Sequence, residues 1–133
     1  MTRRIIAETL ETIGQRPVDT YFDRVVKYIP ADVVAAWVAT LGIVKSGGGD
    51  SIVLWVAFVF GLVITFLWVL RNTTEPGKPR AYTQCAISTA AFAVWVFALG
   101  EPFASAIPNQ AMFGALLLIA FTLTVGLVVP KEA

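Results

Sequence analysis

Few side chains in the apolar part of this 133-residue chain carry chemistry, and Asp32 is the only acid among them. A carboxylate inside an apolar segment is a candidate for proton coupling or cation binding. Pro30 suits the first turn of a helix, where the helix dipole also favours an anion such as Asp32. Because Asp32 lies one turn inside the segment, the sequence favours a structural, helix-capping role, with Lys27 or Arg80 as its expected partner.

Uncharged polar residues within the other apolar segments form a second group of candidates. Such residues either line a water-filled path or hold helices together by hydrogen bonds, and the second role is the more common one. Glu101, next to Pro102, is a candidate for an acid at the outer mouth of a pore. We favour the alternative, in which it is a solvated loop charge. The candidate pathway or interhelical polar residues are Asp32, Thr65, Gln84, Ser88, Thr89 and Thr122.

Several classes of function lack the residues that they need. The chain has no histidine, which removes the commonest metal ligand and the usual general base. Its one cysteine, Cys85, has no basic neighbour in sequence that would activate a thiolate. The net charge of +1 supplies no basic stripe for nucleic acid. We therefore expect no enzyme, no catalytic, metal or cofactor site, and no nucleic-acid partner.

Hydrophobic residues make up 57% of the chain and charged residues 14%, against roughly 25% charged in soluble domains. The apolar residues gather in blocks, which predicts an all-α membrane protein with a four-transmembrane-helix bundle (residues 29–133). The most secure segment is the uncharged run 51–70, whereas 29–44 spans roughly 24 Å, less than the ~30 Å hydrocarbon layer. The predicted spans are 29–44, 51–70, 81–99 and 111–129.

Residues 1–28 predict amphipathic helices that precede the bundle. Ile6, Leu10 and Ile13 have helical spacing within residues 1–16. A second stripe of apolar residues, from Val18 to Ile29, has charged residues on its opposite face. This pattern is typical of a helix in the headgroup plane, with a cytoplasmic helix packed on a partner subunit as the alternative.

Basic residues decide the predicted topology, because cytoplasmic loops carry the excess of lysine and arginine. If all four segments cross, nine of the ten basic residues share one side with both termini, and only Lys45 lies opposite. We expect a multi-pass protein of a bacterial inner (cell) membrane with both termini in the cytoplasm. The nine are Arg3, Arg4, Arg16, Arg24, Lys27, Arg71, Lys78, Arg80 and Lys131.

Small residues in the apolar segments predict close helix packing, since helices in lipid associate through close contact rather than the hydrophobic effect. Their faces are expected to meet in the middle of the bundle, and Trp37 is expected to have a packing role. The candidate packing residues are Ala35, Ala39, Ala57, Gly61 and Gly126.

The length and four-span layout resemble the small multidrug resistance transporters, which are compact dimeric proton-coupled exporters. That family relies on a glutamate well inside its first span; here Asp32 is the only candidate, and the N-terminal stretch of about 28 residues is additional. The sequence favours a non-enzymatic membrane protein that self-associates as a scaffold or pore-forming assembly. The alternatives are a small transporter or ion channel that uses Asp32, Gln84 and Ser88, and an accessory subunit of a larger complex. The expected partners are the lipid bilayer, further copies of the chain and another membrane or cytosolic subunit.

Overall fold

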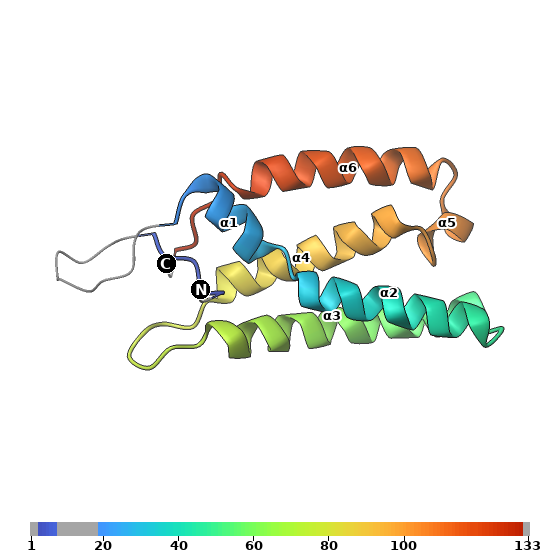
Figure 1. Cartoon of the computed structure of the whole chain (residues 1–133), viewed down its shortest axis with the longest axis horizontal. Helices are drawn as coiled ribbons and strands as arrows, with labels where there is room; N and C mark the ends of the chain where they lie inside the picture. The colour runs from blue at the N-terminus through green and yellow to red at the C-terminus, as the bar shows by residue number, and fades with distance from the viewer. Residues whose placement is uncertain (1–2, 8–18, 132–133) are drawn as a thin grey trace.

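The structure is a computed structural model that describes residues 3–7 and 19–131. The described residues contain helices and no strand. The four longer helices run side by side along the long axis, with α1 and the short α5 at opposite ends (Figure 1). The helices are α1 (Tyr21–Tyr28), α2 (Ala31–Ser46), α3 (Ser51–Thr73), α4 (Tyr82–Leu99), α5 (Phe103–Ala106) and α6 (Gln110–Val125).

Three helical stretches among the described residues are long and apolar enough to cross a bilayer: 21–46, which joins α1 and α2, then α3 and α4. α3 and α4 correspond to the predicted segments 51–70 and 81–99. α6 is apolar but has only 16 residues, fewer than the ~20 that a span usually needs. Its helix ends at Val125, short of the predicted limit at residue 129, so a fourth crossing stays a prediction.

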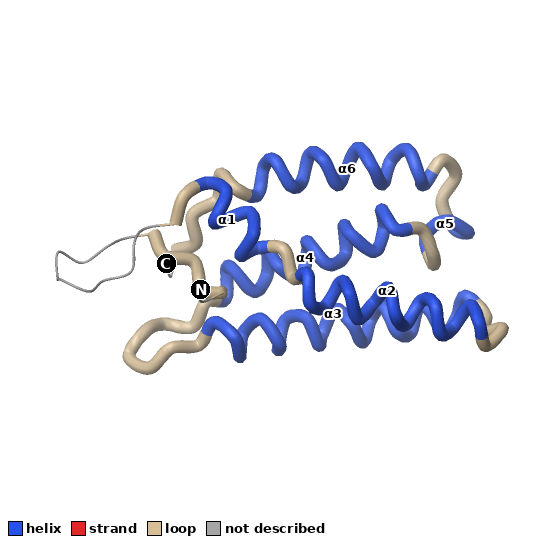
Figure 2. Tube along the Cα trace, viewed as in Figure 1, coloured by secondary structure: helices blue, strands red, loops and turns tan. Residues whose placement is uncertain are grey.

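α4 is the central helix of the fold. It packs against α3 on one side and α6 on the other, while α2 packs on α3 and α4. Within the described residues, α6 contacts neither α2 nor α3. Figure 2 shows α4 between α6 and the α2–α3 pair. The long helices therefore form an open array around α4, and the predicted four-helix bundle is not confirmed.

Large rings, not small side chains, fill the contact among α2, α3 and α4. The ring centroid of Trp37 lies 6.3 Å from that of Phe58 and 6.0 Å from that of Phe92, both nearly edge-on. This edge-to-face geometry suits the quadrupoles of aromatic rings. Trp37 is only 4% exposed, which confirms its predicted packing role.

α1 packs across the ends of α4 and α6. It begins with a capping box, in which Thr20 and Asp23 each accept a hydrogen bond from the other's backbone N–H. Polar side chains of α1 then donate to carbonyl groups at and beyond the end of α6, which lack helical partners. These hydrogen bonds are Tyr21 to Leu123 at 2.5 Å, Arg24 to Gly126 at 2.8 Å and Tyr28 to Val128 at 2.8 Å.

The first described segment, residues 3–7, is not helical. The predicted helix over residues 1–16 is therefore wrong for residues 3–7, and residues 8–16 lie outside the described part. Side chains replace the helical hydrogen bonds: the N–H of Ile5 donates to Gln84 Oε1 at 2.9 Å and that of Ile6 to Asp19 Oδ2 at 2.5 Å. Tertiary partners have thus outweighed the local helical pattern.

Candidate functional site

Asp32 lies in the first turn of α2 and has three hydrogen-bond donors around it. Arg3 Nη2 lies 2.7 Å from Oδ1, Trp68 Nε1 lies 2.5 Å from Oδ2, and the N–H of Val33 donates to Oδ1 at 3.1 Å. The expected pairing with Lys27 is wrong, because Lys27 binds Asp19 instead, and Arg80 is exposed. Arg3 joins the N-terminal segment to α2, and Trp68 joins α2 to α3.

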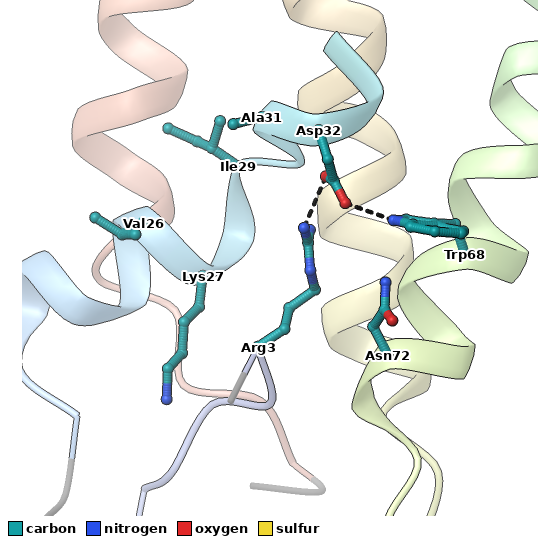
Figure 3. Close-up of a pocket in the computed structure, with 8 residues that line it drawn as sticks. All are labelled: Arg3, Val26, Lys27, Ile29, Ala31, Asp32, Trp68 and Asn72. Atoms are coloured by element: carbon teal, nitrogen blue, oxygen red, sulfur yellow. Dashed lines mark hydrogen bonds and ion pairs between the residues drawn. The ribbon is translucent and has the colours of Figure 1, made fainter. Parts of the chain in front are cut away.

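A pocket of about 620 Å³ opens beside this group of side chains. Figure 3 shows Arg3 and Trp68 converging on Asp32, with Asn72 below Trp68 and with Val26 and Ile29 on the opposite wall. The Lys27 side chain runs away from Asp32. The pocket thus combines charged, amide and indole groups on one wall with apolar side chains on the other.

A buried ion pair lies behind this pocket. Lys27 Nζ is 2.7 Å from Asp19 Oδ2, and the two side chains are only 2% and 8% exposed. Lys27 Nζ also donates to the carbonyl oxygen of Arg4 at 2.9 Å, and the Arg4 guanidinium donates to the carbonyl oxygen of Thr73 at 3.2 Å. Complete hydrogen bonding is what makes such a buried pair tolerable.

Gln84 is buried at the start of α4, and both the oxygen and the nitrogen of its amide bind the backbone of residues 3–7. Its Oε1 accepts from the N–H of Ile5 at 2.9 Å, and its Nε2 donates to the carbonyl oxygen of Arg3 at 2.6 Å. In the described residues Gln84 therefore contacts protein backbone and lines neither of the pockets beside α2.

The remaining polar candidates are divided between local bonds and burial. Thr65 and Thr89 donate to carbonyl groups four residues earlier in their own helices, at 2.6 Å and 2.8 Å. Ser88 is fully buried, and its hydroxyl has no hydrogen-bond partner among the residues that the structure describes. Thr122 is half-buried on α6. These residues do not converge on Asp32, and a pathway through them stays a prediction.

Glu101 lies at the end of the molecule opposite the termini. Both of its carboxylate oxygens accept from the hydroxyl of Ser105, at 2.7 Å and 2.9 Å. This local bond ties the carboxylate to α5, in keeping with a loop charge. A ring of such acids around an axis is untested.

The small residues fall on two different kinds of surface. Ala35 and Ala39 are exposed on α2, whereas Ala57 and Gly61 of α3 are half-buried. Gly126 is buried, and a Cβ added there would lie 2.4 Å from a ring atom of Tyr21. The expectation that all small faces meet in the middle therefore fails for α2, because its buried side chain is Trp37 and not one of the small residues.

Several residues of the site escaped the sequence analysis. Arg3 and Arg4 were interpreted only as cytoplasmic charge, and Asp19 only as part of a polar helix face. A chemical argument could have found them. Asp19 and Asp32 are acids in or near apolar segments, and a carboxylate in such surroundings needs a cation within reach. Gly114 was also missed, although a Cβ there would lie 2.9 Å from the backbone Cα of Ala98.

The arrangement supplies a polar pocket at one end of α2 and α3. The described residues contain no group of three or more metal-ligating side chains. No known protein family, curated protein or solved structure matches the chain.

Proposed function

We propose that this chain is a non-enzymatic membrane protein that crosses the bilayer four times and self-associates as a scaffold. The observation that carries the proposal is the outward face of α2. Ala35, Ala39 and Gly42 are exposed there, and a Cβ added at Gly42 would meet nothing within 4 Å. In lipid, a small-residue face gains little from acyl chains and much from another helix at close range.

The open array supports association through α2. α2 buries only Trp37 in the chain. Its free face carries no charge between Val33 and Val44. A second copy seated on this face would cover the small residues with helix instead of lipid. The same face could accept a different membrane subunit, which is the alternative that the test below separates.

The distribution of charge supports four crossings with both termini in the cytoplasm of a bacterial inner membrane. Both ends of the described chain and the loop between α3 and α4 lie together at one end of the molecule (Figure 1). Of the nine basic residues that the structure describes, eight lie at that end. Lys45 follows α2's apolar run at the opposite end. This asymmetry is the one that fixes orientation in membranes.

The hydrogen bonds of Asp32 support a structural role over proton coupling. A proton carrier must alternate between ionised and neutral forms, whereas Asp32 accepts from a guanidinium, an indole and a backbone N–H. Each of these donors favours the ionised carboxylate. Asp32 thus fastens α2 to α3 and to the N-terminal segment.

The test is the subunit number of the full chain in nanodiscs, measured by native mass spectrometry. We expect a homo-oligomer that Ala35→Leu with Ala39→Leu dissociates, lowering self-affinity at least tenfold because branched side chains hold the backbones apart. Ala120→Leu on the exposed face of α6 is the matched control and should keep the oligomer. A monomeric wild-type chain, or an oligomer that survives the α2 substitutions, contradicts the proposal. A fixed-ratio complex with another polypeptide supports the accessory-subunit alternative.

A further inference from the structure

A seam between α2 and α3 joins two pockets of opposite character. The polar pocket described above includes Asp32 of α2 and Trp68 of α3. A second pocket, of about 210 Å³, is lined by Ala36 of α2 and Ile64 of α3. Ala36 follows Asp32 by four residues, and Ile64 precedes Trp68 by four. Since four residues make about one helical turn, the apolar pocket continues the polar one along the same side of the helix pair.

The apolar pocket is built from small and aromatic side chains. Its walls include Gly61 and the ring of Phe92, with Trp37 beside them. Alkyl and aromatic carbon make up most of the lining, so a hydrocarbon chain fits its chemistry.

The polar pocket has the chemistry of a headgroup site. Arg3 donates from Nη2 to Asp32, while its Nη1 is a buried donor without an acceptor among the described residues. Phosphate oxygens are acceptors that match the two-pronged guanidinium. Asn72 adds an exposed amide to the same pocket, and Trp68, which is 46% exposed, suits the headgroup level of a membrane.

We propose that this seam binds one phospholipid molecule, with its phosphate beside Arg3 and one acyl chain in the apolar pocket between α2 and α3. The ligand class follows from the order of the pockets, because only an amphiphile places an anionic group and a hydrocarbon chain one turn apart. The bound lipid fills the space that α2 leaves against α3. This site faces the seam with α3 and lies beside the outward face of α2 that is assigned to self-association.

The test is a lipid titration of the delipidated full chain in detergent, read by native mass spectrometry with phosphatidylglycerol as the probe. We expect one saturable lipid per chain. Ala36→Leu fills the slot from an exposed helix position and should weaken binding at least tenfold, while Ala120→Leu should leave it unchanged. Arg3→Gln should lower the preference for phosphatidylglycerol over diacylglycerol at least fivefold.

Other outcomes overturn the proposal. Non-saturable binding, or equal affinity for wild type and Ala36→Leu, removes the acyl-chain slot. Displacement of the lipid by millimolar inorganic phosphate alone identifies an anion site instead. Should Ala36→Leu fail to fold, tryptophan quenching by chain-brominated phosphatidylglycerol decides: Trp37→Phe should remove part of the quenching, and unchanged quenching contradicts the proposal. Binding by chains that remain monomeric separates this site from self-association.

Discussion

The amide oxygen of Gln84 accepts a hydrogen bond from the N–H of Ile5 at 2.9 Å, although the two residues are 79 positions apart in the chain. The other half of the same amide donates to the carbonyl oxygen of Arg3. One side chain of α4 thus pairs with both a backbone donor and a backbone acceptor of residues 3–7, which are not helical. It also holds Arg3 where its guanidinium reaches Asp32.

Gln84→Leu should release residues 3–7. Leucine keeps most of the volume but leaves two buried backbone groups without partners, at about 1–3 kcal/mol each. Cleavage by trypsin after Arg4 should become at least tenfold faster in detergent micelles. Gln110→Leu is the matched control, because Gln110 bonds the carbonyl oxygen of Phe97 in another part of the fold. Equal cleavage of the Gln84 variant and wild type would show that the amide does not hold the segment.

Lys27→Met should destabilise the fold by about 3–5 kcal/mol, because it leaves the buried carboxylate of Asp19 without its cation. The measurement is thermal unfolding followed by helical circular dichroism. Combining Lys27→Met with Asp19→Asn should recover part of the loss, since an amide needs no counter-ion and its oxygen can still accept from Ile6. Additive losses in the double variant would refute a direct coupling of the two side chains.

Gly114→Ala should weaken the contact of α4 with α6 and cost about 1–3 kcal/mol, as expected for overpacking. The new methyl group would meet backbone atoms, which cannot rotate away. Gly42→Ala is the matched control: nothing lies within 4 Å of its Cβ, so alanine should stabilise α2 by roughly 0.5–1 kcal/mol. Both are measured by unfolding at detergent excess, which keeps the chain monomeric. A harmless Gly114→Ala would mean that α4 and α6 are farther apart.

Trp37→Phe should change stability by less than about 1 kcal/mol, because it trims the ring but also removes a buried N–H without a partner. Trp37→Ala should cost about 3–5 kcal/mol, since it removes both edge-to-face contacts and leaves a cavity. Unfolding of the two variants side by side is the check. Similar losses of stability in both variants would indicate that the indole N–H does make a hydrogen bond, which contradicts the prediction.

Reporter domains fused within the turn at Gly48 and after the last residue should report opposite compartments, with the C-terminal one in the cytoplasm. The physical basis is the single lysine at the α2–α3 end against the basic residues near the termini. Alkaline phosphatase and a fluorescent protein are the paired reporters. The same compartment for both fusions would rule out three crossings after Gly48, and with them the four-span arrangement.

Composition and periodicity predict much of the helical part of this fold. The uncharged run that begins at Ser51 and the segment that ends at Leu99 needed only hydropathy and polar boundaries. The end of α6 did not follow hydropathy, because Gly126 lies against Tyr21 and the chain turns there despite the apolar residues beyond. That contact joins positions about a hundred residues apart, which no local pattern encodes.

The candidate site was predicted only in part, because its residues come from segments that are far apart in the sequence. Asp32 stands out because a lone acid in an apolar segment needs compensation. Its partners Arg3 and Trp68 come from distant segments, so only the fold could identify them. Gln84 was recognised as a polar residue within an apolar segment, but the backbone that it binds carries no sequence signal.

The bonds from α1 to the end of α6 have a consequence for biosynthesis. Tyr21 leaves the ribosome about a hundred residues before Leu123, whose carbonyl oxygen it binds. During that interval water takes the place of those carbonyl groups as the acceptor for the donors of α1. The bonds between α1 and the end of α6 can therefore form only after α6 has been synthesised.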